Sequence, residues 1–474
     1  MTTTQAALAL KLGSITGPNW VKHRRSELKV FESDGLPTHR SEPGLAVLPG
    51  SREEVIEVLK VLAGEGIPFV ARGAGTGLSG GALADPDSVL IVLTRLQRIL
   101  AVDPAGRRAT VEPGVINARL SAAVARYGLA YAPDPSSQTA CTLGGNVALN
   151  AGGPHCLKYG VTSNHITALE VVLPDGEIVE LGSPQGEPWG PDLVGLFVGS
   201  EGMFGIATRI TVRLIPAPQE VHTFLAAFPS IRAASEAVAG IIAAGIVPAA
   251  LEMMDNALIR AVEASIYAAG YPIDAAAVLI VEVDGTAAQV ALESRRVASL
   301  LQDHGAAEIR SAASPGERAS LWQGRKKAFG AMGRLTRDLL VQDAVVPRSA
   351  LPKVLDGIAA IGEQHHLAVR NVFHAGDGNL HPNICFDGRN PSEVERVHQA
   401  SGAIMALCLA AGGTITGEHG VGADKLPFMD LLFTPETLRV MCGVREAFDP
   451  AGRANPGKVI PVRRCQEWQA GGIR

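Results

Sequence analysis

The prediction of the fold starts from one loop, Arg72-Gly73-Ala74-Gly75-Thr76-Gly77-Leu78-Ser79-Gly80-Gly81, which follows an apolar run at 67–72. This loop contains the pattern G-x-G-x-x-G, but a nicotinamide-binding Rossmann site needs a helix directly after it. Asp85-Pro86 and a new apolar run at 89–94 leave no room for that helix. A P-loop is excluded as well, because no Gly-Lys-Ser/Thr follows. The remaining interpretations are a nest of backbone N–H groups that holds a diphosphate, and an ordinary glycine-rich turn.

The segments around this loop carry clear helix and strand signals. Ser51 and Glu54 form a capping box, and the apolar spacing after them predicts a helix over 51–66. An Asp175-Gly176 turn predicts a hairpin over 169–181. Further strands are predicted at 67–72, 89–94 and 206–215. Pro216-Ala217-Pro218 then interrupts the chain, so we expect a domain boundary there.

A second polar region rich in glycine lies between residues 133 and 153. It contains Pro133-Asp134-Pro135-Ser136-Ser137-Gln138-Thr139, then Gly144-Gly145-Asn146, then Asn150-Ala151-Gly152-Gly153. Gly202-Met203-Phe204-Gly205-Ile206 offers a third glycine-rich approach. Small residues let the backbone come close to a ligand. Two such loops in one domain therefore suit a long, extended nucleotide.

The middle of the chain alternates between helical and strand patterns. Helices are predicted at 231–244, 287–304, 316–333 and 351–366, and strands at 278–283, 307–311 and 339–346. This alternation indicates an α+β layer, for which a split βαβ topology is a candidate.

The sharpest chemical signal is a hairpin whose Asp377-Gly378 turn joins two apolar strands. If the turn is centred on Asp377-Gly378, His374 faces His381 directly, and Asn383 lies on the same face. Directly opposed side chains have Cβ atoms about 4.5–5.5 Å apart, close enough for two imidazoles to share one divalent metal. The alternative is a pair of cross-strand histidines in a polar core.

A third metal ligand is available in Gly417-Glu418-His419-Gly420. Glu418 offers a carboxylate, and His419, which points the other way, offers a base. Two histidines, one carboxylate and an open position are a common donor set of catalytic zinc sites. We therefore favour a metal site built from His374, His381 and Glu418 over the polar-core alternative.

Composition excludes several classes of protein. The chain has 474 residues, which predicts two to four domains, and a net charge of −5 with 4% aromatic residues. That balance does not fit a nucleic-acid-binding surface.

The six cysteines form no C-x-x-C pair, so an iron–sulfur cluster in this chain is not expected. Residues 1–13 show no secretory signal and the most apolar stretch, 237–251, is too short to span a bilayer, so we expect a cytoplasmic protein.

Together these segments resemble the FAD-linked oxidases of the vanillyl-alcohol oxidase and PCMH-type superfamily. Within it, the chain is most similar to the FAD-binding D subunits of bacterial glycolate oxidases (glycolate dehydrogenases), from about residue 45 to residue 460. The marks of this resemblance are Arg72 to Gly81, Gly144-Gly145-Asn146, Gly324-Arg325-Lys326-Lys327-Ala328-Phe329, His374 to His381, Gly417 to Gly420, and Asn455-Pro456-Gly457-Lys458.

The resemblance implies an α+β fold with a two-part PCMH-type FAD-binding domain and a ferredoxin-like cap. We expect the FAD-binding domain at 1–218 and the cap, which carries the metal hairpin, at 219–420. The helical segment at 421–474 is expected to pack back on the FAD-binding domain. Some relatives attach FAD to a histidine of the first loop. Because that loop has no histidine here, we expect non-covalent FAD.

The resemblance also implies roles for individual residues. The expected FAD contacts are Arg72, Gly73, Ala74, Gly75, Thr76, Gly77, Leu78, Ser79, Gly80, Pro133, Asp134, Thr139, Gly144, Gly145, Asn146, Ala151, Gly152, Gly153, Glu201, Gly205, Ile206 and Asn455. His374, His381 and Glu418 match ligands of zinc, manganese or iron in metal-dependent relatives. His419 matches the proposed base, and Arg325 and Asn383 match substrate-binding positions.

The implied activity is oxidation of a small 2-hydroxy acid, glycolate or D-lactate, to the 2-oxo acid. Related glycolate subunits tend to read Asp-Gly-Thr-Ile-Pro-Arg where this chain has Asp343-Ala344-Val345-Val346-Pro347-Arg348. Phe329 replaces a polar substrate contact of the hydroxyglutarate relatives, which favours a small substrate. The family further implies a second flavin-fold subunit and an iron–sulfur subunit, or a quinone as acceptor, with the complex docked at the inner face of the membrane.

Three alternatives remain open at this point. The chain is a dehydrogenase of D-lactate or D-2-hydroxyglutarate, a non-catalytic scaffold subunit with the FAD fold, or a zinc hydrolase. The hydrolase alternative leaves the glycine loops unexplained.

Overall fold

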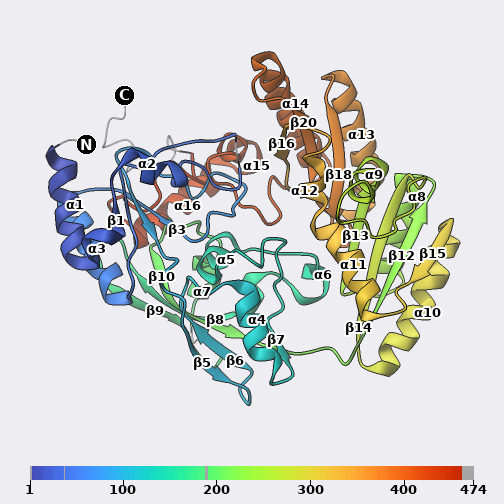
Figure 1. Cartoon of the computed structure of the whole chain (residues 1–474), viewed down its shortest axis with the longest axis horizontal. Helices are drawn as coiled ribbons and strands as arrows, with labels where there is room; N and C mark the ends of the chain where they lie inside the picture. The colour runs from blue at the N-terminus through green and yellow to red at the C-terminus, as the bar shows by residue number, and fades with distance from the viewer. Residues whose placement is uncertain (1–2, 37, 187–189, 462–474) are drawn as a thin grey trace. The chain divides into compact units, whose positions relative to one another are not determined.

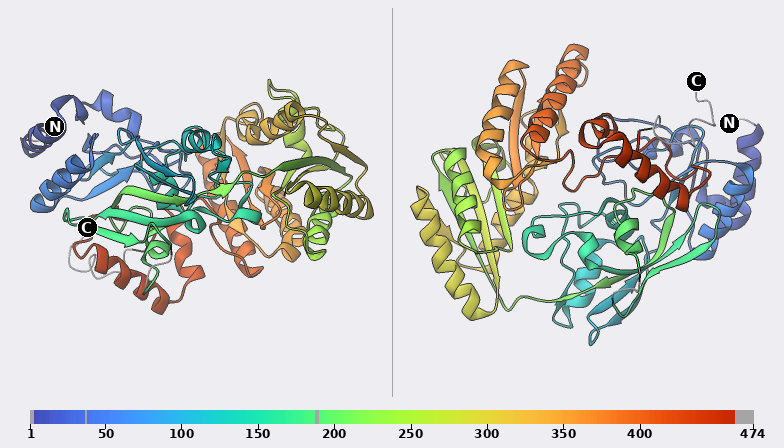
Figure 2. Two further views of the ribbon diagram at one scale, coloured as in Figure 1. Left: turned by 90° about the horizontal axis from the view of Figure 1, so that it is seen from below. Right: turned by 180° about the vertical axis from the view of Figure 1, so that it is seen from behind.

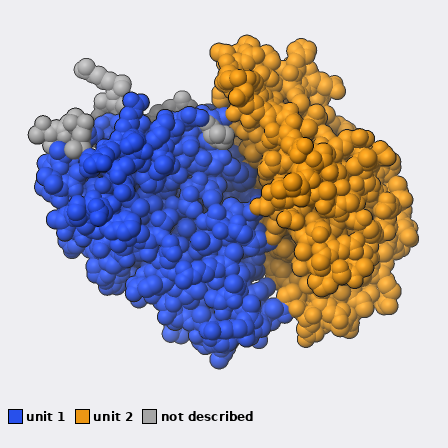
Figure 3. Space-filling view, viewed as in Figure 1, with its two compact units in different colours: residues 1–152, 161–217, 418–474 blue, residues 153–160, 218–417 orange. Residues whose placement is uncertain are grey.

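The computed structural model describes residues 3–36, 38–186 and 190–461 of the chain. The chain divides into two compact units, drawn in different colours in Figure 3. Unit 1 consists of residues 1–152, 161–217 and 418–474, and unit 2 of residues 153–160 and 218–417. Unit 2 thus contains a short segment, 153–160, that the sequence placed in the first domain. Part of the expected C-terminal segment, 462–474, lies outside the described residues.

Unit 1 contains two main sheets (Figure 1). Its strands are β1 (Val21–Lys22), β2 (Leu45–Val47), β3 (Phe69–Arg72), β4 (Val89–Val92), β5 (Ile99–Asp103), β6 (Arg108–Val111), β7 (Leu129–Ala130), β8 (Ile166–Val172), β9 (Ile178–Gly182), β10 (Ile206–Arg213) and β11 (Ile215–Pro216). Its helices are α1 (Thr3–Thr16), η1 (Pro18–Trp20), α2 (Arg25–Leu28), η2 (Lys29–Phe31), α3 (Arg52–Glu65), α4 (Asn117–Ala125), α5 (Leu143–Leu149), η3 (Thr162–His165), α7 (Leu193–Phe197), η5 (Leu426–Phe428), α15 (Met429–Leu432) and α16 (Pro435–Phe448).

The first sheet of unit 1 has the order β1-β2-β4-β3 and leads into the glycine loop. β3 and β4 are parallel, and α3 crosses between β2 and β3, as the apolar spacing predicted. The Ser51 side chain accepts a hydrogen bond from Glu54 N (3.2 Å), and Gly66 ends the helix at φ +67°. The buried face of α3 packs on β2, β3 and β4. β3 ends with Arg72, directly before the glycine loop.

The second sheet of unit 1 has the order β5-β6-β10-β8-β9. β8 and β9 form the predicted hairpin, and Glu177 N donates to Asp175 Oδ1 (3.0 Å) within its turn. α16 packs on the same core, where Phe448 stacks on Phe204 with ring centroids 4.7 Å apart. The right-hand view of Figure 2 shows α16, in red, beside the strands of this unit.

Unit 2 is built on one antiparallel sheet with the order β15-β12-β14-β13-β18-β19-β17, to which β16 and β20 are attached. Its strands are β12 (Glu220–Phe228), β13 (Ala250–Asp255), β14 (Ala277–Gly285), β15 (Glu308–Ser311), β16 (Asp338–Val341), β17 (Ala344–Val345), β18 (Ala368–His374), β19 (Asn379–Leu380) and β20 (Pro382–Phe386). Its helices are α6 (Cys156–Tyr159), α8 (Ile231–Ala243), α9 (Asn256–Glu263), α10 (Ala287–Asp303), α11 (Pro315–Lys326), α12 (Ala328–Met332), η4 (Arg348–Ala350), α13 (Leu351–Gln364) and α14 (Pro391–Ala410).

The central strands of unit 2 are covered on both faces. Val278 and Ile280 of β14 belong to a core shared with α9, α11 and α12, whereas α8 and α10 also contact β12 and β14. Residues 277–284 of β14 are buried without interruption, as expected for a strand with helices on both sides. The mixture of helices and strands confirms the α+β prediction, and the ferredoxin-like topology of the cap stays a prediction. No described helix is both long enough and apolar enough to cross a bilayer.

Candidate functional site

The glycine loop of unit 1 presents its backbone N–H groups without partners. None of the N–H groups of residues 73–81 donates a hydrogen bond to another residue that the structure describes. The loop is braced from behind by Arg72, whose guanidinium donates to Ser33 O (2.9 Å). A Cβ on Gly75, which has φ +70°, would collide with that guanidinium. Glycine at this position is therefore required both by the backbone conformation and by the close approach of Arg72.

The second predicted loop uses most of its N–H groups internally. Thr142 caps α5 by accepting from Gly145 N (3.3 Å), and Gly144 N donates to Pro113 O (2.8 Å). Pro133 O accepts from Asn117 Nδ2 (2.9 Å), whereas Thr139 is exposed. Few backbone N–H groups of this loop therefore remain to donate to a ligand, and its expected contribution is close approach of the backbone.

Glu201 has a role that the sequence did not reveal. Its buried carboxylate accepts hydrogen bonds from Val421 N (2.6 Å) and Gly422 N (2.8 Å). Burial raises the pKa of Glu201 to about 7, although these two hydrogen bonds oppose the rise. Asn455 Nδ2 donates to Glu201 O (2.6 Å), which ties the same residue to the C-terminal segment of unit 1.

Two other expected FAD contacts are also accounted for by the packing of unit 1. Ile206 lies in the core beneath the first sheet. Gly205 has φ +122°, and a Cβ there would meet Val172 O at 2.5 Å. The packing of β10 against β8 therefore accounts for the residue types at Gly205 and Ile206.

The hairpin of unit 2 has a different register from the predicted one. His374 pairs with Asn379, and Arg370 pairs with Asn383, so the pairing is displaced by two residues and the prediction that His374 directly faces His381 is wrong. The reason lies in the neighbouring strands: Gly376 N donates to Leu251 O (3.2 Å) of β13, which draws Gly376 into a longer turn. The imidazole rings nevertheless lie together, with centroids 5.2 Å apart.

Both hairpin histidines present Nδ1 to a protein acceptor. His374 Nδ1 lies 2.7 Å from Glu252 Oε1, and His381 Nδ1 lies 3.2 Å from Gln342 O and 3.9 Å from Asp343 Oδ1. These acceptors favour the tautomer that carries its proton on Nδ1 and leaves the lone pair on Nε2. Metal-binding histidines are oriented by second partners of this kind.

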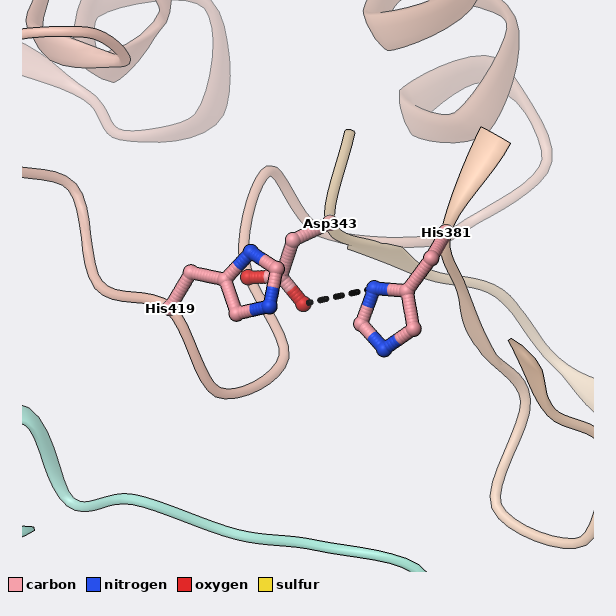
Figure 4. A group of neighbouring side chains, drawn as sticks. All are labelled: Asp343, His381 and His419. Carbon is pink, nitrogen blue, oxygen red and sulfur yellow. Dashed lines mark ion pairs between the residues drawn. The ribbon is translucent and has the colours of Figure 1, made fainter. Parts of the chain in front are cut away.

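The loop that carries Glu418 and His419 is anchored beside these histidines. Asp343 Oδ2 accepts from Thr416 Oγ1 (2.6 Å) and from Gly417 N (3.0 Å), and the next two residues of the chain are Glu418 and His419. The candidate ligand atoms of His374, His381 and Glu418 lie within 4.8 Å of one another. Asp343, His381 and His419 form a second such group, shown in Figure 4 with the ion pair between Asp343 and His381 dashed.

Arg325 and Asn383 are both buried close to the histidines. Arg325 is 1% exposed, and its Nε and Nη1 make no hydrogen bond with any described residue. Its Nη2 lies 2.5 Å from Glu252 Oε2, without the alignment of a hydrogen bond. Asn383 Nδ2 donates to His381 O (2.6 Å), so the amide oxygen of Asn383 is what remains to accept from a ligand.

Comparisons with known proteins now add an independent observation. Residues 43–182 match the family described as "FAD binding domain", and residues 217–459 match "FAD linked oxidases, C-terminal domain". "Glycolate oxidase subunit GlcD" of Escherichia coli is 49% identical over 95% of this chain and 90% of that protein.

The chain belongs to the FAD-linked oxidases. A "D-lactate dehydrogenase" of Anaerostipes hadrus is 33% identical to this FAD-linked oxidase over 89% of the chain and 90% of that protein. The crystal structure of p-cresol methylhydroxylase with substrate bound covers 97% of each chain with a TM-score of 0.81 and 18% identity. That likeness shows the PCMH-type fold.

The residues of this FAD-linked oxidase fit its cofactor. Unbonded N–H groups over 73–81 are donors of the kind that hold a diphosphate, and they lie in the segment matched by the FAD-binding family. Two imidazoles and the carboxylate of Glu418 form a donor set of the kind that holds zinc, manganese or iron. His374, His381 and Glu418 are thus the residues that could hold a metal ion.

Glu252 of this FAD-linked oxidase is a site residue that was not predicted from the sequence. A signal was present, because Glu252 interrupts an otherwise apolar run in Ala250-Leu251-Glu252-Met253-Met254. A charged residue in the middle of a buried strand is rare unless it has a partner. The partners, His374 and Arg325, come from β18 and α11 and are distant in the sequence.

Proposed function

We propose that this FAD-linked oxidase dehydrogenates a small 2-hydroxy acid, glycolate or D-lactate, to the 2-oxo acid. The observation that carries the proposal is Arg325, a fully buried guanidinium that pairs with Glu252 through Nη2 and whose Nε and Nη1 have no hydrogen-bond partner among the described residues. A buried cation of this kind is costly unless a ligand completes its hydrogen bonds. A carboxylate is the ligand that a guanidinium matches best. Two similar proteins are named after glycolate and D-lactate, and each of these acids carries a carboxylate that such a guanidinium would bind.

The roles of the other residues follow from their chemistry. Arg325 binds the substrate carboxylate, and Asn383 occupies a second substrate-binding position beside His381. His419 takes the hydroxyl proton as general base, a contribution of about 10²–10⁴-fold. Bound FAD would supply the acceptor for the hydride of the α-carbon. His374, His381 and Glu418 would hold a divalent ion, zinc or manganese or iron, whose charge would lower the pKa of the substrate hydroxyl.

A small substrate is favoured by the surroundings of the histidines. The Phe329 ring meets His381 edge-on, with ring centroids 6.5 Å apart. An apolar ring there gives no partner to a second carboxylate, and unpaired charge in a buried site is unfavourable. D-2-hydroxyglutarate, which carries a second carboxylate, is therefore disfavoured as the substrate.

The electrons must leave the reduced flavin, and we propose that they pass to a partner. The cysteine spacing of this chain does not suit an iron–sulfur cluster, so the cluster belongs to another protein. The similar Escherichia coli protein is named as a subunit. A second flavin-fold subunit and an iron–sulfur subunit, docked in the cytoplasm at the inner face of the membrane, are the proposed partners. A quinone is the alternative acceptor.

Anaerobic reduction of the bound flavin tests the proposal. Glycolate, D-lactate, L-lactate and D-2-hydroxyglutarate are added separately to FAD-loaded protein, with and without a chelator, and the flavin absorbance is followed. We expect bleaching by glycolate or D-lactate, and loss of bleaching after chelation. Arg325→Gln should raise the KM strongly, whereas Arg318→Gln, on the same helix, should not. A flavin that no hydroxy acid bleaches would identify a scaffold subunit instead and overturn the proposal.

A further inference from the structure

Helix α11 covers two acidic side chains of the sheet in unit 2. Arg318, Trp322 and Arg325 lie on one face of this helix, because they are spaced at i, i+4 and i+7. Arg318 pairs with Glu282 of β14, and Arg325 pairs with Glu252 of β13. The two pairs have the same residue types, the same helix and the same sheet, and this allows a direct comparison.

Glu282 is fully satisfied. It accepts two hydrogen bonds from Arg318 (2.7 and 2.8 Å) and one each from Trp322 Nε1 (2.7 Å) and Thr223 Oγ1 (2.6 Å). Burial by itself would raise the pKa of Glu282, but the hydrogen bonds from His155 and Arg318 hold that pKa well below its usual range. This pair is complete without any ligand, so its role is to attach α11 to the sheet.

Glu252 makes fewer hydrogen bonds than Glu282 does. One oxygen faces His374 Nδ1 at 2.7 Å, while the other lies 2.5 Å from Arg325 Nη2 without making a hydrogen bond. Glu252 and Arg325 are each 1% exposed, so water does not complete the missing bonds at the surface. A buried pair that is left incomplete in this way is typical of a functional site.

We propose that Glu252 is a positioning residue that controls both the metal site and the anion site, an inference that rests on the proposed function. By accepting from Nδ1, Glu252 fixes the His374 tautomer that offers Nε2 to a metal ion. Its negative charge also favours a cation near His374. The same charge partly neutralises Arg325 and weakens the hold of that guanidinium on a substrate carboxylate. Glu252 therefore balances tight metal binding against release of the acid.

This balance predicts effects of opposite sign in one variant. In Glu252→Gln, the affinity of FAD-loaded protein for Mn²⁺, measured by calorimetry, should fall by roughly 10–100-fold. The affinity of chelator-treated protein for oxalate, measured from the flavin absorbance, should rise by roughly tenfold, because a negative charge near the anion is gone. Glu282→Gln is the matched control, which should lower the free energy of unfolding and leave both affinities within about twofold.

A purely structural role for Glu252 would weaken both affinities together, and that result, or no change in either, would overturn the proposal. If Glu252→Gln does not fold, ¹⁵N NMR of wild-type histidines, with His374→Gln used for assignment, still decides the matter. His374 must carry its proton on Nδ1, and the opposite tautomer refutes the inference. If wild-type protein binds no Mn²⁺, the metal part of the proposed function fails, while the oxalate and tautomer measurements still test Glu252.

Discussion

The strongest prediction concerns the carboxyl group of Glu201 and the pH dependence of stability. Burial raises the pKa of Glu201 from 4.5 to about 7. Between these two values the folded protein keeps a proton that the unfolded chain has lost, so stability falls as the pH rises through this window. A rise from 4.5 to about 7 corresponds to a loss of about 3 kcal/mol once the pH exceeds the folded-state pKa.

Glu201→Gln removes the ionisation and keeps the size of the side chain. Val421 N and Gly422 N donate to different oxygens of Glu201, and the amide of glutamine can accept from only one of them, so the variant should be less stable than wild type at about pH 5. Between about pH 5 and pH 8.5, the difference in free energy of unfolding between variant and wild type should shift by about 2.5 kcal/mol in favour of the variant, because part of the loss has already occurred at pH 5. The cause is that only wild type must bury a charge.

Urea unfolding of FAD-loaded protein, followed by tryptophan fluorescence at both pH values, measures this difference. Glu363→Gln, at an exposed position of α13, is the control for removal of one negative charge and should show no comparable shift. If the Glu201→Gln and wild-type stabilities differ by the same amount at both pH values, the pKa of Glu201 is not raised and the reasoning from burial is wrong.

Three further predictions concern the loops and the histidines. Gly75→Ala should weaken FAD binding by about tenfold, because the left-handed backbone costs an alanine roughly 1–2 kcal/mol and the new methyl group meets Arg72. The amount of flavin that stays with the protein after gel filtration measures the effect, and full retention would contradict the prediction. His419→Ala should lower turnover of the hydroxy acid by about 10²–10⁴-fold while FAD stays bound, and normal turnover excludes His419 as the base. His381→Ala should lose bound divalent metal, as elemental analysis would show, and undiminished metal content removes His381 from the ligand set.

Local sequence determined the elements around the glycine loop. The helix α3 begins after Ser51 and ends at Gly66 because its capping groups are adjacent in the chain. The absence of a helix after Gly81 followed from Asp85-Pro86 and the strand that begins at Val89. In each case the physical cause lies within a few residues, so a single sequence contains it.

The register of the histidine hairpin was decided by tertiary structure. The Asp377-Gly378 dipeptide favours a two-residue turn, but the hydrogen bond from Gly376 N to Leu251 O is made to a strand more than a hundred residues away. That bond displaces the pairing by two residues. Because side chains alternate with a period of two, a displacement by two keeps both histidines on one face of the hairpin. The rings of His374 and His381 therefore lie close together although the predicted register is wrong.

The sequence by itself determined the residue types of the candidate site: two histidines near a tight turn, a Glu-His pair between glycines, and a loop of bare N–H groups. Only the tertiary structure decided which of them have partners. Glu252, Glu201 and Asp343 acquire their roles from groups distant in the chain. The physical reason is that desolvation and hydrogen bonding depend on what packs around a charge, and packing is a property of the folded chain.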